Sequence, residues 1–389
     1  MTDKNDKTRI STSKEAVLSA KRLVIKVGSA LLMQGREGDL NRDWMSTLGA
    51  DIAAARQRGQ EVVLVSSGAI ALGRGSLGLT GAHLTLEQNQ AAAAAGQIAL
   101  AHAWQEILGP RELKVAQILL TLDDTEQRRR YLNARSTLST LLQLGAIPVI
   151  NENDTVATQE IRYGDNDRLA ARVASMISAD CLVLFSDIDG LYNDPERLGD
   201  PQAHIAEVDE LNEDIFAMAG EAGSHFSSGG MKTKLQAARI ATEAGASMVL
   251  TSGKADHPLQ SMIEDRQRST LFRSKANPRA ARKNWIAASL QTGGKIFIDA
   301  GAGKALEQGR SLLPIGISSI EGQFERGDCV AVYGPDGVEI ARGLVEHAAD
   351  TAEQIIGKQT AEIAAFLSYN GRVEMIHRDN LVMTQKSGT

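Results

Sequence analysis

The chain has 389 residues, of which 43% are hydrophobic and 23% are charged, so it can bury cores for roughly two or three ordinary soluble domains. Its formal net charge of −6 gives no global sign of a nucleic-acid or membrane-surface partner. No apolar stretch is long enough to span a bilayer, and residues 1–20 lack the apolar core of a secretory signal. Cys181 and Cys329 lie in apolar runs that are typical of reduced core thiols. We therefore expect a cytoplasmic protein that begins with a flexible polar tail over residues 1–20.

Strand and helix signals alternate between residues 21 and 253. The expected strands are apolar along their whole length, which indicates that both faces of their sheet are covered. The segments between them have helical patterns, and helical crossovers favour parallel strands. One of these helices, over residues 85–108, opens with a capping box formed by Thr85 and Gln88. The fold class predicted for residues 21–273 is therefore α/β, an open and mostly parallel sheet sandwiched by helices. The expected strands are LVIKV (23–27), EVVLVSS (61–67), KVAQILL (114–120), AIPVIN (146–151), CLVLFSD (181–187) and SMVLTSG (247–253).

The pattern changes after residue 273. Residues 274–284 contain a proline and four basic residues, which indicates a linker, taken here as 274–291. Short β-type segments separated by Gly, Pro and Asp then follow, beginning with KIFIDAGA at residue 295. They predict a small β-rich domain over residues 292–370, closed as a barrel or a sandwich, and a C-terminal tail over residues 371–389.

Small, polar or charged residues gather where the expected strands end, which is where ligands bind in an open parallel sheet. Two loops that precede helices, GDND (164–167) and SSGGMKTK (227–234), add further such residues. Glycines let backbone N–H groups approach phosphate oxygens, and lysines neutralise the charge that shifts during phosphoryl transfer. The residues concerned are Lys26, Gly28, Ser67, Gly68, Asn151, Asp154, Asp165, Asn166, Asp167, Ser186, Asp187, Gly229, Gly230, Lys232 and Lys234.

Each of these features also has a plainer explanation. Lys232 and Lys234 could form a solvated helix face, and the SSGAI segment could be an ordinary strand-to-helix turn with a serine cap. Lys26 is harder to explain, because a lysine inside an apolar strand is rarely tolerated unless it is paired or functional. GRGSLG (73–78) matches a dinucleotide-binding pattern by its letters alone, and we interpret it as a glycine-rich loop. The seven histidines show no metal-ligand spacing, so no protein metal site is expected.

The motifs VIKVGSALL, VSSGAIALG, PVINENDTVAT, GDNDRLAA, FSDIDGLY and GGMKTKLQAA, in this order and spacing, resemble those of the amino-acid kinase family. The resemblance runs from about residue 21 to the end of the second domain, which itself resembles a PUA domain. It implies an amino-acid kinase fold followed by a PUA-like barrel.

The resemblance also implies a role for each matching residue. Lys26 and Lys234 would contact the transferring phosphoryl group, and Asp167 would hold these lysines in place. Glutamate would be bound by Ser67, Gly68, Asn151, Asp154, Asp165 and Asn166, with Asp154 on its α-ammonium group. ATP would be bound by Lys26, Gly28, Ser186, Asp187, Ser228, Gly229, Gly230, Met231, Lys232, Thr233 and Lys234. Ser227-Ser228 stands where the family pattern leads us to expect a Gly-Thr or Gly-Ser pair.

The implied reaction uses ATP with Mg²⁺ to phosphorylate the γ-carboxylate of L-glutamate, the first step of proline biosynthesis. The resemblance further implies feedback inhibition by proline, a homo-oligomer assembled through the kinase domain, and transient transfer of the product to a glutamate phosphate reductase.

Three alternatives remain open from the sequence. A kinase of the same fold could act on N-acetylglutamate, aspartate or a nucleoside monophosphate, but a free α-ammonium group is what calls for a carboxylate such as Asp154. The second domain could bind RNA, yet residues 294–357 contain five Lys or Arg against ten Asp or Glu, which disfavours phosphate contacts. That domain could also be purely regulatory or architectural.

Overall fold

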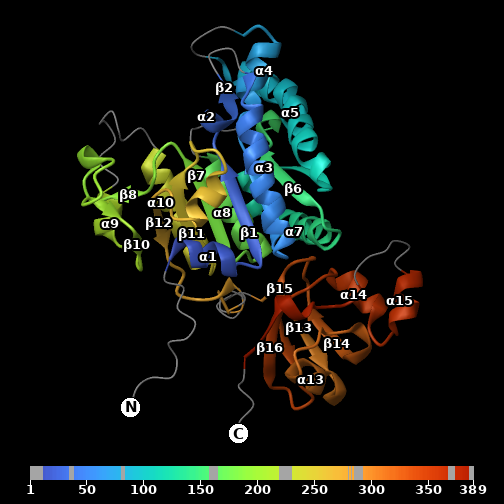
Figure 1. Ribbon diagram of the computed structural model, residues 1–389. Helices are drawn as coiled ribbons and strands as arrows, with labels where there is room; N and C mark the ends of the chain where they lie inside the picture. The colour runs from blue at the N-terminus through green and yellow to red at the C-terminus, as the bar shows by residue number, and fades with distance from the viewer. Residues whose placement is uncertain are drawn as a thin grey trace, which may run out of the picture. The chain divides into compact units, whose positions relative to one another are not determined.

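The computed structural model describes residues 12–34, 39–79, 84–156, 165–218, 230–278, 280–281, 283, 292–366 and 373–384. The chain divides into two compact units, Met1–Gln127 with Asn133–Pro278, and Arg128–Leu132 with Arg279–Thr389 (Figure 1). In the described part of the chain, no helix is long and apolar enough to cross a membrane.

The first unit is built on one twisted sheet, which has eight strands within the described residues (Figure 1). The six strands from β11 to β5 are mutually parallel, whereas β12 runs antiparallel to β11. The prediction of an open, mostly parallel sheet is confirmed. In sheet order the strands are β10 (Glu207–Val208), β12 (Ser269–Phe272), β11 (Ser247–Ser252), β7 (Cys181–Ser186), β1 (Arg22–Val27), β4 (Glu61–Ser66), β6 (Ile147–Glu152) and β5 (Val115–Leu120).

Helices cover both faces of this sheet. On one face, Leu23 and Ile25 of β1 belong to a core shared with α1 (Ser13–Ser19), α3 (Arg42–Gln57), α5 (Leu86–Leu108) and α11 (Pro258–Ile263). Side chains alternate along a strand, so Lys26 points to the opposite face. There it meets α8 (Asp165–Ile177), against which α10 (Gly230–Glu243) packs. This alternation turns Lys26 away from that apolar core and toward α8.

The other elements of this part of the chain are short, apart from α7. They are α2 (Ser29–Leu32), β2 (Met33–Gln34), β3 (Asp39–Leu40), α4 (Ala69–Ser76), η1 (Gly109–Arg111), α6 (Leu122–Glu126), α7 (Arg128–Gln143), η2 (Asp154–Val156), β8 (Leu191–Tyr192), η3 (Pro195–Arg197), β9 (His204–Ile205) and α9 (Glu213–Ala217).

Helices α4 and α5 touch backbone to backbone. A Cβ atom added to Gly73 would lie 1.7 Å from the carbonyl oxygen of Ala92, and one added to Gly96 would lie 1.8 Å from that of Ala69. The interpretation of residues 73–78 as a glycine-rich loop is therefore wrong, because Gly73 and Gly75 are helical residues of α4. Gly73 is needed for close helix packing and not for a turn.

Parts of two segments that were predicted as tails form regular secondary structure. Residues 13–19 form α1, whose Ala16 and Val17 are buried and whose cap, Thr12, accepts a hydrogen bond from the Glu15 amide (3.1 Å). Within the predicted C-terminal tail, β17 (Leu381–Met383) pairs with β16 (Glu339–Leu344). Among its described residues, each segment contains only three buried apolar side chains, which are Ala16, Val17 and Ala20 in the first and Met375, Ile376 and Leu381 in the second, and such short groups give no detectable periodicity.

The second unit is a small β-rich domain, as predicted. Within the described residues its sheet has the order β14 (Ile317–Gly322), β13 (Gly294–Ile298), β15 (Cys329–Tyr333), β16 and β17. Its apolar core gathers side chains such as Ile296, Val330 and Val332. The helices are α13 (Ala300–Glu307), α14 (Ala349–Ile355) and α15 (Thr360–Phe366), with the short turns η4 (Pro314–Gly316) and η5 (Arg378–Asn380).

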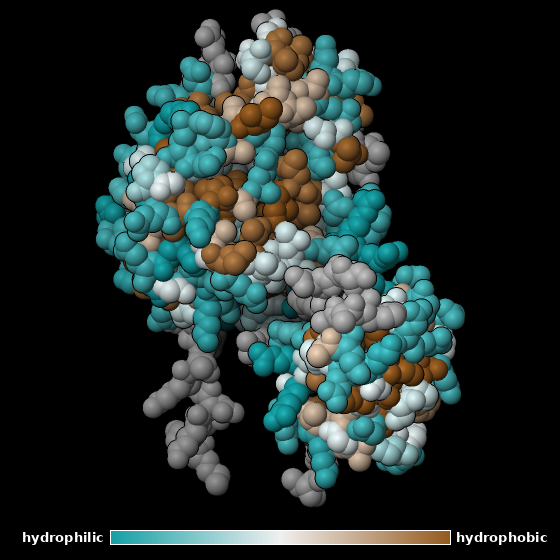
Figure 2. Space-filling view, turned by 90° about the vertical axis from the view of Figure 1, so that its right-hand side faces the viewer, coloured by the Kyte–Doolittle hydropathy of each residue, from teal (hydrophilic) through white to brown (hydrophobic). Residues whose placement is uncertain are grey.

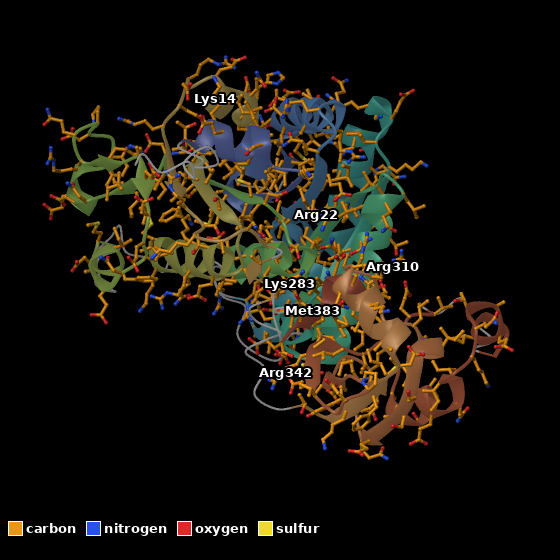
Figure 3. The ribbon with its side chains drawn as sticks, turned by 90° about the horizontal axis from the view of Figure 1, so that it is seen from below. Lys14, Arg22, Lys283, Arg310, Arg342 and Met383 are labelled. Carbon is orange, nitrogen blue, oxygen red and sulfur yellow. The ribbon has the colours of Figure 1, made fainter. Side chains whose placement is uncertain are left out.

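Some charged side chains serve structure alone. Arg22, at the amino end of β1 and thus at the edge of the sheet opposite to the end that Lys26 approaches, pairs with Glu61 of β4 at 2.6 Å (Figure 3). In the second unit, Arg342 of β16 pairs with Glu339 of the same strand at 2.8 Å (Figure 3). In each pair the arginine and the glutamate belong to strands of the same sheet.

Candidate active site

Two lysines converge on one buried carboxylate at the carboxyl end of the central strands. Lys26 of β1 binds Oδ1 of Asp167, which lies at the start of α8. Lys234, one turn into α10, binds Oδ2 of the same carboxylate at 3.2 Å. The exposed fractions of the side chains are 9% for Lys26, 13% for Lys234 and 1% for Asp167. The three predicted catalytic residues are therefore brought together, and both lysine side chains are slightly more exposed than that of Asp167.

The charge state of Asp167 follows from this geometry. Burial alone would raise the pKa of its carboxyl group, but the positive charges of Lys26 and Lys234 outweigh burial and hold that pKa below its ordinary value. Asp167 is therefore ionised at neutral pH. Two ammonium groups sharing one carboxylate leave a net positive charge in a poorly solvated place, which favours an anionic ligand.

A chain of amide hydrogen bonds runs beside the lysines. Asn166 donates from Nδ2 to the hydroxyl oxygen of Ser67 (2.9 Å) and to Oδ1 of Asn151 (3.3 Å). Asn151, which is 2% exposed at the end of β6, donates in turn to Oε1 of Gln97 in α5 (2.7 Å). Oδ1 of Asn166 is buried and has no hydrogen-bond partner within the described residues. A buried acceptor without a donor is costly, so this oxygen marks a place for a ligand N–H group.

The local backbone explains why these groups meet. The amide of Ser67 donates to the carbonyl of Val27 (3.1 Å), which ties the ends of β4 and β1 together. Gly68 then adopts a φ of +105°, a conformation that favours glycine, and begins α4. Asp154 is buried in η2, just after β6. Asp165 begins α8, and its side chain lies outside the described part of the chain.

The residues predicted to bind nucleotide lie at the ends of β1 and β7 and at the start of α10. Ser186 is buried at the end of β7 and donates to Oδ1 of Asp187 (2.9 Å), which is exposed. Gly230 begins α10, and its carbonyl accepts from the hydroxyl of Thr233 (2.9 Å) and from Nζ of Lys234 (3.4 Å). Met231 and Lys232 lie in the same first turn, and a Cβ added to Gly28 would lie 3.5 Å from Nζ of Lys26. Ser228 and Gly229 lie outside the described residues.

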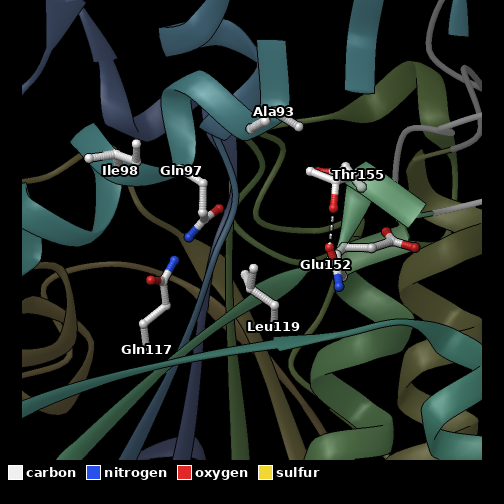
Figure 4. Close-up of a pocket in the computed structure, with 10 residues that line it drawn as sticks. Ala93, Gln97, Ile98, Gln117, Leu119, Glu152 and Thr155 are labelled. Carbon is white, nitrogen blue, oxygen red and sulfur yellow. Dashed lines mark hydrogen bonds between the residues drawn. The ribbon is translucent and has the colours of Figure 1, made fainter. Parts of the chain in front are cut away.

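A cavity of about 310 Å³ opens beside the amide chain, between α5, β5 and the segment that follows β6. Gln97 of α5 and Gln117 of β5 point toward one another across it (Figure 4). Asp154 is among the residues that line this cavity. Gln97 was not predicted as a site residue. The signal that could have found it is the one amide side chain within the Ala-rich stretch AAAAAGQIALA of that helix.

No group of three or more His, Cys, Asp or Glu side chains that could hold a metal ion occurs among the residues the structure describes. A Mg²⁺ ion that arrives with a nucleotide needs no such group, because phosphate oxygens and water supply most of its ligands.

A lysine from a central parallel strand and a lysine from a helix start, held by one buried carboxylate at the carboxyl edge of an α/β sheet, form the arrangement of a phosphoryl-transfer enzyme. Residues 21–252 match the model of the amino acid kinase family, and residues 294–367 match that of the PUA domain. The chain belongs to the amino acid kinase family, as the motifs predicted.

Relatives of similar length carry one name. Glutamate 5-kinase of Paramagnetospirillum magneticum is 59% identical over 94% of this chain and 98% of its own. Glutamate 5-kinase 1 of Rhizobium meliloti is 57% identical over 97% of this chain and 96% of its own, and glutamate 5-kinase of Rhodopseudomonas palustris is 55% identical over 95% and 98%. Among solved structures, UMP kinase of Ureaplasma parvum aligns with 64% of this chain and 95% of its own at 15% identity and a TM-score of 0.44.

Proposed function

We propose that the protein transfers the γ-phosphoryl group of Mg²⁺-bound ATP to the γ-carboxylate of L-glutamate, giving ADP and γ-glutamyl 5-phosphate. This is the first step of proline biosynthesis. A carboxylate oxygen of glutamate forms a bond to the γ-phosphorus while the bond between that phosphorus and the ADP oxygen breaks. The observation that carries the proposal is the convergence of Lys26 and Lys234 on Asp167, and the glutamate 5-kinases that match the chain over nearly its full length support it.

The two lysines stabilise the phosphoryl group as it migrates. Negative charge on its equatorial oxygens is matched by ammonium groups that the buried carboxylate of Asp167 already holds in place. Mg²⁺ comes with the nucleotide and supplies further charge neutralisation at the phosphates. Gly28, Ser186, Asp187 and the residues from Ser228 to Lys234 bind the nucleotide in this proposal.

The substrate is an amino acid with a free α-amino group. Asp154 is buried beside the end of β6, and the unpaired Oδ1 of Asn166 is a second acceptor suited to an ammonium ion. The hydroxyl of Ser67 accepts a hydrogen bond from Asn166, so its own hydrogen can be donated to a substrate carboxylate. The glutamate site in this proposal also includes Gly68, Asn151 and Asp165.

A substrate comparison tests the proposal. Purified protein with Mg²⁺, ATP and hydroxylamine is expected to form ADP and glutamyl hydroxamate with L-glutamate, and neither with N-acetylglutamate. A preference for N-acetylglutamate, or ADP formation that does not depend on an amino acid, would refute it.

The protein also forms a homo-oligomer through the kinase domain in this proposal. The face that carries α5 shows apolar side chains gathered across the larger unit (Figure 2). Ile98 of α5 is 74% exposed, and Leu119 of the edge strand β5 is 36% exposed. An open strand edge beside exposed apolar side chains is suited to pairing with a second copy. Sedimentation of the native protein and of Ile98→Asp should give an oligomer and a smaller species, and two identical profiles would exclude this surface.

Regulation and location complete the proposal. The enzyme works in the cytoplasm in this proposal, and a glutamate phosphate reductase uses the acyl phosphate as its substrate. Proline acts as a feedback inhibitor that binds at the glutamate site. Competitive inhibition by proline should raise the apparent KM for glutamate without changing kcat, and a fall in kcat alone would place the inhibitor elsewhere.

A further inference from the structure

We propose that Gln97 is a positioning residue that sets the orientation of the two amide side chains in the substrate site, and with them the preference for a free α-amino group. The inference rests on the proposed function, because it concerns the same glutamate site.

Gln97 is not among the residues predicted to bind glutamate, but it contacts one of them, Asn151. Its side chain is half-buried on α5 and lines the cavity beside the site, where its Oε1 accepts a hydrogen bond from Nδ2 of Asn151 at 2.7 Å. Asn151 is buried at the end of β6, so this is the contact that decides which end of its amide faces α5. With Nδ2 turned toward Gln97, Oδ1 of Asn151 faces Asn166.

The orientation of the Asn151 amide determines that of the Asn166 amide. Because Oδ1 of Asn151 can only accept, Asn166 must present Nδ2 to it, and does so at 3.3 Å. The same Nδ2 donates to the hydroxyl of Ser67 at 2.9 Å. Both hydrogens of Nδ2 are thereby used, and Oδ1 of Asn166 is left as the buried acceptor without a partner. The two links from Asn166 to Gln97 therefore run in one direction, with each amide nitrogen donating to the next amide oxygen.

The direction matters for the substrate. An acceptor at Asn166 attracts an ammonium group, whereas a reversed amide would present N–H groups to it and repel it. In the absence of the Gln97 oxygen, Asn151 has no fixed preference for either orientation, and the acceptor at Asn166 is only partly maintained. Removal of the Gln97 oxygen should therefore weaken binding of the substrate amino group and leave the rate of phosphoryl transfer unchanged.

Two substitutions at one position separate this role from a packing role. Gln97→Met keeps the length of the side chain and removes the acceptor, and the KM for glutamate should rise about tenfold, with kcat and the KM for ATP within about twofold of native. Gln97→Glu keeps an acceptor oxygen and should stay within about threefold of the native KM for glutamate. Gln105→Met, the same substitution at an exposed position of the same helix, is the control and should change none of the three.

Glutarate, which lacks the amino group, supplies the discriminating measurement. Its inhibition constant as a competitor of glutamate should be nearly the same for the native protein and Gln97→Met, because it makes no contact with the acceptor at Asn166. Equal weakening of glutamate and glutarate, an unchanged KM for Gln97→Met, or an equal loss in Gln97→Glu would overturn the role of Gln97. A native protein that forms no ADP with glutamate would instead overturn the proposed function.

Discussion

Lys26 and Lys234 bind the two different oxygens of one carboxylate, that of Asp167, although one lysine lies on the central strand β1 and the other on α10. The pairing fixes both ammonium groups before a ligand arrives, so little reorganisation is needed when charge moves during transfer.

Lys234→Ala should lower kcat on the order of 10²- to 10³-fold with a much smaller change in the KM for glutamate, because its charge acts mainly on the migrating phosphoryl group. Steady-state kinetics with both substrates varied measures this split. Lys234→Arg keeps the positive charge and should lose less. A rise in the KM for glutamate at unchanged kcat would reassign Lys234 to substrate binding.

Asp154→Asn should show the opposite profile. Removing the carboxylate leaves the ammonium group of glutamate without its charged partner, so the KM for glutamate should rise about tenfold or more while the KM for ATP stays the same. The KM for ATP is the internal control for local unfolding. A large fall in kcat with an unchanged KM for glutamate would contradict the role of Asp154.

Asp167→Asn should reduce stability by about 3 kcal/mol at pH 7, because two ammonium groups lose their buried partner. The pKa of Asp167 is depressed in the folded state, so its contribution is complete above the unfolded value of about 3.9 and is lost as the pH falls through the folded value. The difference in unfolding free energy between native protein and variant should therefore be constant from pH 8 to pH 5. A difference that shrinks already within this range, measured by urea titration, would mean that burial outweighs the lysines.

Gly96→Ala should destabilise the first unit by about 3 kcal/mol, although alanine is the better helix former. The added Cβ would meet the carbonyl of Ala69 at 1.8 Å and push α4 away from α5. Gly109→Ala, at the end of the same helix with nothing within 4 Å of the added atom, is the matched control and should be neutral or slightly stabilising. Equal melting temperatures for both variants would contradict backbone contact between the helices.

Much of the site could be predicted because parallel strands bring their carboxyl ends to one edge of a sheet. Lys26, Ser67, Asn151 and Ser186 follow from that rule alone, once the strands are identified. Asp167 and Lys234 lie near them because both are close to the starts of helices that cover one face, a placement that the motifs already indicated.

What could not be predicted depends on packing between distant segments. Helix α4 was not fully predicted because its glycines suggested a loop, whereas Gly73 allows close contact with α5. Helix α1 was not predicted because most of its residues are polar and only Ala16 and Val17 within it are buried. Gln97 was missed because its partner, Asn151, lies on another element, and nothing in the helix pattern shows which residue a side chain will meet.

Whether glutamate itself accepts the phosphoryl group can be followed through one oxygen atom. With L-glutamate carrying ¹⁸O in its γ-carboxylate, Mg²⁺-ATP and hydroxylamine, attack by the carboxylate places an ¹⁸O atom in the bridge between carbon and phosphorus. Hydroxylamine then displaces the phosphate at the carbonyl carbon, so the phosphate released should contain one ¹⁸O atom by mass spectrometry. Phosphate without ¹⁸O, formed alongside ADP, would mean that water and not glutamate accepts the phosphoryl group, and would contradict the account.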